Sequence, residues 1–193
     1  MIAALFVRAD SHYKTIPGVD CWDMERDARL FQGGSPVIAH PPCRAWGQLS
    51  HIAKPRHDEK DLAYFAVKKV RECGGVLEHP AKSKLWAAAG LPSPGHRDEF
   101  GGWTIMVSQF WWGHKAEKKT LLYIVGIEPA ELPDIPFVMG EAPCVVASSG
   151  RRKDGRRLKR RPEISKKERE ATPPAFANFL IEIANKCARK YEH

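Results

Sequence analysis

The sequence predicts an α/β fold in which a mostly parallel sheet carries helices on both faces. Short apolar runs at 2–7, 36–39 and 76–77 have the length and composition of buried strands. Between the last two runs, residues 58–73 place apolar side chains at the helical i, i+3, i+4 spacing. A strand, a helix and a second strand in this order favour parallel pairing with a right-handed crossover, and this unit defines the fold class.

The N-terminal part of the chain is predicted to form two strands and a helix before the central unit. Residues 2–7 form the first strand, and residues 19–22 form a short second one. Residues 23–31 are predicted as a helix, because an aspartate suits its N-cap and two glycines follow it. The strand at 36–39 must stop before Pro41, since proline donates no hydrogen bond to a sheet.

The central helix is predicted to begin at Asp58, and the glycine pair 74–75 is predicted to end it. The strand that follows covers only 76–77, because polar residues and a proline come directly after it. Residues 82–89 then form a short helix.

The C-terminal part is predicted to close the sheet with an antiparallel hairpin. Its strands, 103–110 and 120–125, are joined by a link that is too short for a parallel crossover. Residues 128–143 contain four prolines and no periodicity, so we expect no regular element there. Thr172 and Pro173 are predicted to open a final helix as N-cap and first helical residue. The apolar face of that helix comprises Phe176, Leu180, Ile183, Ala184 and Cys187.

Length and composition predict one globular domain, 1–193, located in the cytoplasm. The 193 residues are 43% hydrophobic and contain no apolar run long enough for a membrane span, so we expect no membrane partner. The five cysteines are odd in number and widely spaced. This pattern is typical of a reduced protein without a disulfide framework or a zinc knuckle.

A basic segment at 151–161 carries eight Lys or Arg residues and one Asp, whereas the rest of the chain is nearly neutral. Gly and Ser residues flank it, so 148–168 is predicted to be a basic loop or arm within the domain. This charge density indicates contact with a polyanion, and we expect nucleic acid as the partner. A merely solvated charged loop is the alternative. The predicted nucleic-acid-binding residues are Arg151, Arg152, Arg156, Arg157, Lys159, Arg160, Arg161 and Lys119.

Cys43 and Glu78 each follow one strand of the predicted parallel unit. Because the carboxyl ends of parallel strands meet at one edge of a sheet, we expect both side chains to face the same crevice. A thiolate adds to C6 of a pyrimidine when an acid assists at N3, and burial would raise the pKa of Glu78 for that role. The Arg44 cation is expected to favour the thiolate of Cys43. A small buried thiol without chemistry is the alternative.

Four segments, in this order, resemble DNA cytosine-5 methyltransferases. Pro41-Pro42-Cys43 resembles the catalytic Pro-Cys loop of that family, and Glu78-His79-Pro80 is similar to its Glu-Asn motif. The segments 109–126 and 172–187 resemble the end of the catalytic sheet and the terminal helix, particularly in compact phage-encoded relatives. The resemblance implies a Rossmann-like methyltransferase sheet, and a phage-encoded protein would act in the host cytoplasm.

The resemblance also implies a reaction, in which a cysteine attacks C6 of a pyrimidine base in DNA or a nucleotide while a glutamate assists at N3. The methyl group would come from S-adenosylmethionine. The catalytic residues implied are Cys43, Glu78, Pro42 and Arg44, and the cofactor-binding residues are Phe6, Asp10, Asp20 and Pro41.

Several features leave alternatives open. The family uses a glycine-rich turn after its first strand, but here no glycine occurs before Gly18, and 127–162 has no room for a separate target-recognition domain. The alternatives are a non-catalytic nucleic-acid-binding protein on a methyltransferase scaffold and a pyrimidine-modifying enzyme with another cofactor. We expect no metal ion; the metal-site alternative would combine His40, His79, His114 and Cys43, while Trp111 and Trp112 would either stack on bases or pack in the core.

Overall fold

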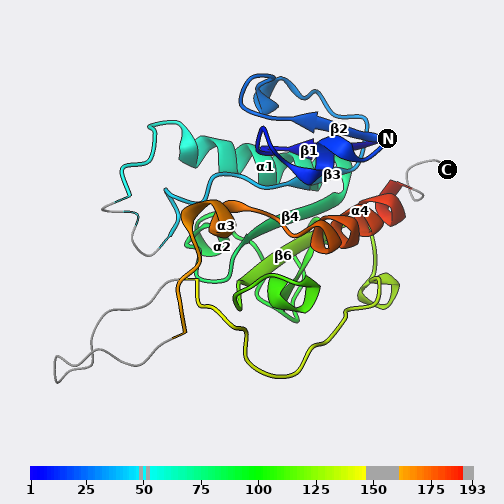
Figure 1. Ribbon diagram of the computed structural model, residues 1–193. Coiled ribbons are helices and arrows are strands. Elements are labelled where there is room, and N and C mark those ends of the chain that lie inside the picture. Colours follow the sequence, from blue (N-terminus) through cyan, green and yellow to red (C-terminus); the bar gives the residue numbers. More distant parts are fainter. Residues whose placement is uncertain (48–49, 51–52, 147–160, 189–193) are drawn as a thin grey trace.

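The chain folds around a six-stranded mixed sheet, seen in the computed structural model of Figure 1. The structure describes residues 1–47, 50, 53–146 and 161–188. The strand order is β2-β1-β3-β4-β6-β5. Strands β2, β1, β3 and β4 run parallel, and β6 runs antiparallel between β4 and β5. The predicted α/β class, with an antiparallel hairpin at one end of a mostly parallel sheet, is confirmed.

The parallel half of the sheet places two strand ends side by side. It consists of β1 (Ile2–Leu5), β2 (Val19–Trp22), β3 (Val37–Ala39) and β4 (Gly75–Pro80). In the register between β3 and β4, the last residue of β3 lies opposite Leu77. The chain therefore leaves β3 next to Glu78, the residue that follows Leu77 in β4.

The antiparallel half extends β4 beyond its predicted length. β6 (Lys119–Val125) pairs with β5 (Trp103–Ser108) and also with β4, where Pro80 lies opposite Thr120. This pairing continues β4 through Glu78 and His79, so the prediction of a strand confined to 76–77 is wrong. Proline is tolerated because it occupies the last position of the strand.

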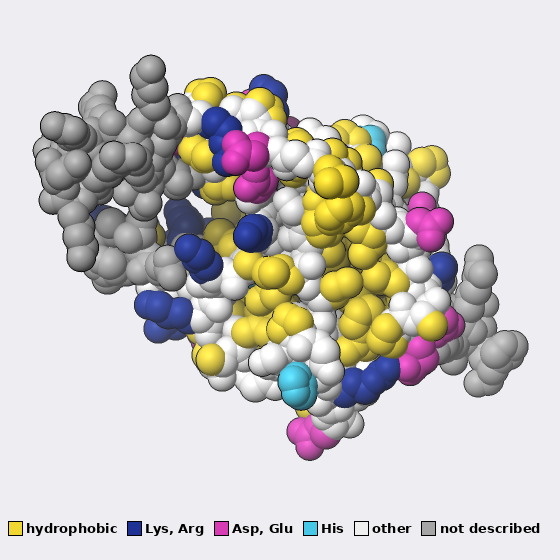
Figure 2. Space-filling view, turned by 90° about the horizontal axis from the view of Figure 1, so that it is seen from below, with side chains coloured by type: hydrophobic (Ala, Val, Ile, Leu, Met, Phe, Trp, Pro, Cys, Tyr) yellow, Lys and Arg dark blue, Asp and Glu magenta, His cyan; other side chains and the backbone are white. Residues whose placement is uncertain are grey.

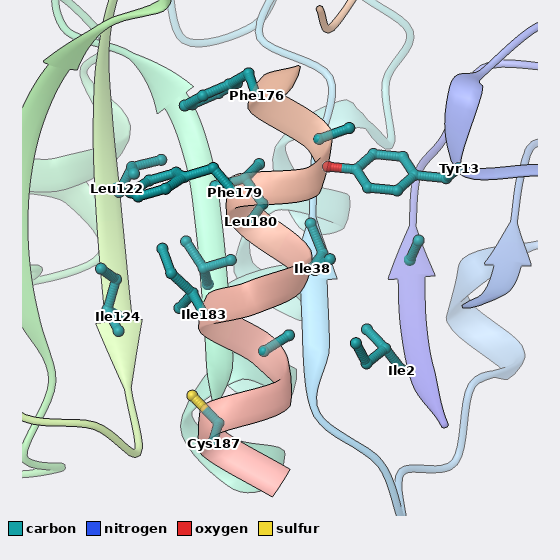
Figure 3. Packing of buried hydrophobic residues seen from close by; sticks show 14 of the residues in the cluster. Ile2, Tyr13, Ile38, Leu122, Ile124, Phe176, Phe179, Leu180, Ile183 and Cys187 are labelled. Atoms are coloured by element: carbon teal, nitrogen blue, oxygen red, sulfur yellow. The ribbon is translucent and has the colours of Figure 1, made fainter. Parts of the chain in front are cut away.

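Each face of the sheet is covered by one long helix. α4 (Pro174–Ala188) packs on β1, β3 and β4, and α1 (Glu59–Cys73) packs on β3, β4 and β6. Because side chains alternate along a strand, Ile38 joins the core under α4, whereas its neighbours Val37 and Ala39 join the core under α1. Figure 3 shows Leu180 and Ile183 of α4 in the first of these cores. The predicted helices on both faces are confirmed.

Short elements connect these layers. They are the helices α2 (Leu85–Ala88) and α3 (Lys166–Glu170) and the 3-10 helices η1 (His12–Thr15), η2 (Ala28–Leu30), η3 (Gln109–Trp112) and η4 (Pro129–Glu131). The final helix begins at Pro174, so Pro174 and not Pro173 is its first residue. All five side chains predicted for its apolar face are buried.

The predicted helix over 23–31 is wrong. Asp23 Oδ1 accepts hydrogen bonds from the backbone N–H groups of Glu25 and Arg26, both at 3.0 Å, and so closes a turn. Asp27 then adopts φ +51°, outside helical geometry, and only η2 follows it.

The segment after β6 lies at the bottom of Figure 1, and Figure 2 shows hydrophobic side chains gathered on the face seen from that side. Phe137 and Met139 of this segment are exposed, and the Phe137 ring lies 5.2 Å from that of Trp111. Trp112 is buried against Phe179, 4.6 Å away, as a core residue. In the described part of the chain, no helix is both long and apolar enough to cross a membrane.

The basic arm predicted at 148–168 is described only in its last part. Residues 147–160, which hold six of the eight predicted nucleic-acid-binding residues, lie outside the described residues. Glu163 forms an isolated bridge with Val145, and α3 begins at Lys166. The end of the predicted arm therefore contains a bridge and a helix and is not a loop throughout.

Candidate active site

Cys43 and Glu78 lie in one site, at the carboxyl edge of neighbouring parallel strands. β3 ends at Ala39, and His40, Pro41 and Pro42 carry the chain past the strand end to Cys43. The charge of Glu78 acts on the Cys43 thiol and raises its pKa, which indicates that the two groups are close. The sequence predicted that Glu78 follows its strand, but the residue lies within β4, opposite Leu122 of β6.

Both carboxylate oxygens of Glu78 are held by polar side chains. His40 Nδ1 lies 3.0 Å from Oε2, and Gln109 Nε2 lies 3.1 Å from Oε1. Behind them, Tyr13 Oη lies 3.1 Å from His40 Nε2, and Gln109 Nε2 also donates to Thr120 Oγ1 at 3.1 Å. Glu78 is only 8% exposed, so these contacts fix its carboxylate from two sides.

The ionisation of Glu78 is the opposite of the prediction. Burial acts to raise its pKa, but the hydrogen bond with His40 and the positive charge of Lys118 outweigh burial and lower the pKa to about 2. Glu78 is therefore an ionised hydrogen-bond acceptor at neutral pH. In this state it can receive a proton, whereas the predicted acid would donate one.

The Cys43 thiol is protonated at neutral pH. The residue is exposed, yet its surroundings desolvate the sulfur, and desolvation together with the charge of Glu78 raises the thiol pKa. The Arg44 guanidinium, predicted to favour the thiolate, pairs with Glu59, and Lys118 is the cation whose charge lowers the pKa of Cys43. Because the thiol is protonated, Cys43 needs a base before it can act as a nucleophile.

Lys118 is a site residue that sequence reasoning missed. It is half-buried just before β6, and its charge lowers the pKa of both Glu78 and Cys43. Its neighbour Lys119, which we predicted to bind nucleic acid, is exposed at the start of β6. The sequence 115–119 contains three lysines, and nothing in their spacing distinguishes the one that faces the site.

His40 and Gln109 were also missed as partners of Glu78, and Tyr13 was missed as the partner of His40. The position of His40, one residue past β3, gave a usable signal, because parallel pairing brings that position beside Glu78. Tyr13 and Gln109 lie in 3-10 helices far from Glu78 in the sequence, and no local pattern marks them.

The predicted alternative of a metal site is not formed. His79 is 1% exposed and stacks near Trp86 with 6.5 Å between the rings, and burial lowers its pKa to about 4. His114 lies 2.9 Å from the Ala116 carbonyl through Nδ1. Within the described residues, no three His, Cys, Asp or Glu side chains come together in a way that could hold a metal ion.

A cleft of about 880 Å³ opens beside Pro42 and Arg44. Its walls come from residues 6–10 after β1, from the turn after β2, from the start of α1 and from Glu170 of α3. The volume falls in the range of about 300–1,000 Å³ that is typical of small-molecule sites. The loop with Cys43 thus borders a cleft at the carboxyl ends of parallel strands, where α/β proteins commonly bind ligands.

The cleft gathers some of the predicted cofactor-binding residues. Phe6 and Asp10 line it, whereas Asp20 and Pro41 do not. Asp20 accepts a hydrogen bond from Trp22 Nε1 at 2.9 Å, and Asp23 lines the cleft instead. Phe6 has φ +61°, a left-handed conformation that usually calls for glycine, so the chain turns after β1 without one.

One carboxylate in the cleft wall has an oxygen without a hydrogen-bond partner among the described residues. Glu59 is fully buried, and its Oε1 pairs with Arg44. Its Oε2 has no hydrogen-bond partner among the described residues. Because buried polar atoms are nearly always paired in native proteins, a ligand with a hydroxyl or amino donor would complete this wall.

Two of the predicted nucleic-acid-binding residues can be placed. Arg161 Nη1 pairs with Glu117 Oε1 at 3.0 Å and also donates to the Ala142 carbonyl, so its charge is already engaged. Lys119 is exposed.

Comparisons with protein families, curated proteins and solved structures found no match to this chain. The function is therefore argued from the site.

Proposed function

We propose that this protein modifies a pyrimidine base in DNA or a nucleotide, as a DNA cytosine-5 methyltransferase-like enzyme with a Rossmann-like methyltransferase sheet. The observation that carries the proposal is the arrangement of the strand ends: the loop with Cys43 leaves β3 next to β4, in which the ionised Glu78 carboxylate is held by His40 and Gln109. The cleft beside Pro42 and the resemblance of the segments around Cys43 and Glu78 support it.

In this proposal Glu78 moves the proton of Cys43. The carboxylate takes the thiol proton while sulfur bonds to C6 of the ring. The C5=C6 electron pair becomes a C4=C5 pair, the C4=N3 pair moves onto N3, and N3 takes the proton from Glu78. One C–S bond has then formed, the proton has moved from sulfur to N3, and C5 is nucleophilic. After transfer, the C5 proton leaves to water, its electron pair restores the C5=C6 bond and the C–S bond breaks. The proton on N3 returns through Glu78 to the released sulfur, so Cys43 is again a thiol and Glu78 a carboxylate.

The volume of the cleft and the unpaired oxygen of Glu59 support S-adenosylmethionine as the ligand in this proposal. When bound, this cofactor would supply the methyl group for C5. Phe6, Asp10 and Asp23 line the cleft, and Glu59 Oε2 would accept from a hydroxyl or amino donor of the ligand. A base within a duplex would have to leave the stack to reach Cys43.

A nucleic-acid-binding protein without catalysis is the second candidate. The protonated state of Cys43 favours it, because a thiol with a raised pKa is a weak nucleophile. The basic segment 151–161 would hold phosphates in either function.

Binding and transfer assays with S-adenosylmethionine test the proposal. At 100 times its dissociation constant the cofactor should stabilise the fold by about 2.7 kcal/mol, which corresponds to a rise in Tm of roughly 5–10 °C for a domain of this size. Labelled methyl groups should reach pyrimidines of DNA, and Cys43→Ala should abolish this transfer while it keeps the thermal shift. No shift and no transfer, with DNA binding that Cys43→Ala leaves unchanged, would establish the second candidate.

A further inference from the structure

We propose that Tyr13 and His40 are positioning residues for Glu78. Tyr13 fixes which nitrogen of His40 carries the proton, and His40 then holds Glu78 as a carboxylate beside Cys43. This inference deepens the proposed function and rests on it, because Glu78 moves the thiol proton there.

The three side chains come from separate elements and form a continuous hydrogen-bonded chain. Tyr13 lies in η1, His40 follows β3, and Glu78 lies in β4. The distances are 3.1 Å from Tyr13 Oη to His40 Nε2 and 3.0 Å from His40 Nδ1 to Glu78 Oε2. The rings of Tyr13 and His40 also pack with 5.5 Å between their centres. Figure 3 shows Tyr13 reaching into the core under α4.

The end groups set the direction of both hydrogen bonds. Tyr13 is 1% exposed, and burial raises its pKa well above 10, so the phenol keeps its proton. The ionised Glu78 carboxylate can only accept, so the imidazole proton sits on Nδ1 and donates to Glu78. In the neutral imidazole Nε2 is then the acceptor for the Tyr13 hydroxyl.

Other groups around Tyr13, His40 and Glu78 do not replace the hydrogen bond that His40 donates to Glu78. Lys118 acts on Glu78 by its charge, Gln109 holds the other oxygen, and burial keeps His79 uncharged at neutral pH. The titratable and charged groups that face the chain from all sides are Cys21, Cys43, His79, Lys118 and, acting on Cys43 from α3, Glu170.

A donor fixed on Nδ1 holds Glu78 in the state and orientation in which it can act. With it, the Glu78 carboxylate carries no proton at neutral pH and can take the thiol proton of Cys43. Without it, burial is opposed by fewer groups and the pKa of Glu78 rises, and the carboxylate loses the contact that orients it beside Cys43. Adduct formation by Cys43 should then be slower at neutral pH, where Glu78 is still ionised.

Two amide variants of His40 separate this role from simple packing. His40→Asn places an amide N–H near the position of Nδ1, whereas His40→Gln places it near Nε2. Tyr13→Phe keeps the buried ring and removes only the hydroxyl, and Tyr64→Phe on exposed Tyr64 is its control. The readout is the ¹³C NMR pH titration of the Glu78 carboxyl in labelled protein, assigned with Glu78→Gln.

We expect wild type and His40→Asn to keep the low pKa of Glu78, and His40→Gln and Tyr13→Phe to raise it by about 1 to 2. With DNA that contains 5-fluorocytosine, His40→Gln and Tyr13→Phe should slow adduct formation at a fixed pH near 7.5, and Tyr64→Phe should change neither the titration nor this rate.

Equal titration of Glu78 in wild type, His40→Gln and Tyr13→Phe would overturn the inference. The titration needs no substrate, so it distinguishes the two proposals: a protein that titrates as expected but forms no adduct contradicts the proposed function alone. If His40→Gln fails to fold, Tyr13→Phe against Tyr64→Phe decides the outcome.

Discussion

Glu78 and His79 are neighbours in β4, and their pKa values fall for different reasons. Burial is the main cause that lowers the pKa of His79, because a charged imidazole is costly in an apolar environment, and the charge of His40 adds to it. Burial acts to raise the pKa of Glu78, and the hydrogen bond with His40 and the charge of Lys118 are the largest of the effects that reverse it. The residue type therefore does not determine whether Glu78 donates or receives a proton. Its immediate neighbours do.

We expect the free energy of unfolding to fall in two stages as the pH is lowered. The His79 pKa drops from 6.5 to about 4 on folding, so between these values only the unfolded chain binds the proton and stability is lost as the pH falls. The Glu78 pKa drops from 4.5 to about 2, so its stabilisation is present above pH 4.5 and is lost as the pH falls through 2. Each stage amounts to about 3 kcal/mol at most.

Urea unfolding at a series of pH values measures both stages. His79→Gln should remove the first stage, whereas His96→Gln, at an exposed histidine, should keep it. A wild-type stability that does not change between pH 6.5 and 4 would contradict the assignment for His79.

Lys118 and Lys119 offer a matched test of the charge at Cys43. Lys118→Gln should raise the pKa of Cys43 and slow its alkylation by iodoacetamide at a fixed pH near 8, because the cation favours the thiolate. Lys119→Gln, at the exposed neighbour, should alkylate at the wild-type rate. Peptide mass spectrometry follows Cys43 separately from the other cysteines. Equal rates in the two variants would contradict the placement of Lys118 in the site.

At the scale of elements, the pairing of β3 with β4 brings Cys43 and Glu78 together, and Gly75 makes that pairing possible. Gly75 has φ +120°, and a Cβ there would lie 2.0 Å from the Val37 carbonyl oxygen. A side chain would force the two strands apart at the start of their register. The geometry of the site therefore depends on a glycine at the opposite end of β4.

Gly75→Ala should destabilise the fold by more than about 3 kcal/mol, because the clash is with backbone that cannot rotate away. Gly90→Ala is the control: Gly90 also has positive φ, at +61°, but its Cβ would meet nothing within 4 Å, so we expect a cost of about 1–2 kcal/mol. Guanidinium unfolding measures both. Similar costs would show that the β3–β4 contact is not tight.

The elements that the sequence predicted are those with a local signature. The helical spacing of apolar residues in α1 and the apolar runs of β1 and β3 follow from the burial of these side chains, so the residue pattern alone predicts them. The extent of β4 depends on its pairing with β6, more than 35 residues away. At Asp23, the side chain caps backbone N–H groups of a turn in the same way as an N-cap residue caps a helix, so the sequence does not distinguish the two. The pair Cys43–Glu78 could be predicted from strand order, whereas Lys118 could not.

At the scale of the whole molecule, α3 ties the C-terminal part of the chain to the end of β1. Arg8 pairs with Glu170 at 3.0 Å, and Lys115 pairs with Glu168 at 2.5 Å. Glu170 also lines the cleft. The helix that follows the basic segment in the sequence thus lies beside the cleft.

The salt dependence of DNA binding should depend on the basic segment and not on Arg161. Replacing Arg156, Arg157, Lys159 and Arg160 with Gln should reduce the slope of log K against log salt by about 3 to 4, since each phosphate contact contributes about 0.9. Arg161→Gln should leave the slope unchanged, because Arg161 already pairs with Glu117. Fluorescence anisotropy at several salt concentrations measures the slopes. An unchanged slope in the fourfold variant would contradict a role of this segment in binding.

The central claim is that Cys43 is a nucleophile whose proton Glu78 takes, and trapping of the covalent adduct tests it most directly. The protein is incubated with DNA that contains 5-fluorocytosine and with S-adenosylmethionine, and the products are analysed by denaturing electrophoresis and peptide mass spectrometry. We expect a covalent adduct on the peptide with Cys43, none with Cys43→Ser, and at least about tenfold less with Glu78→Gln. An adduct on another residue, or none on Cys43 in protein that binds the same DNA, would contradict the claim.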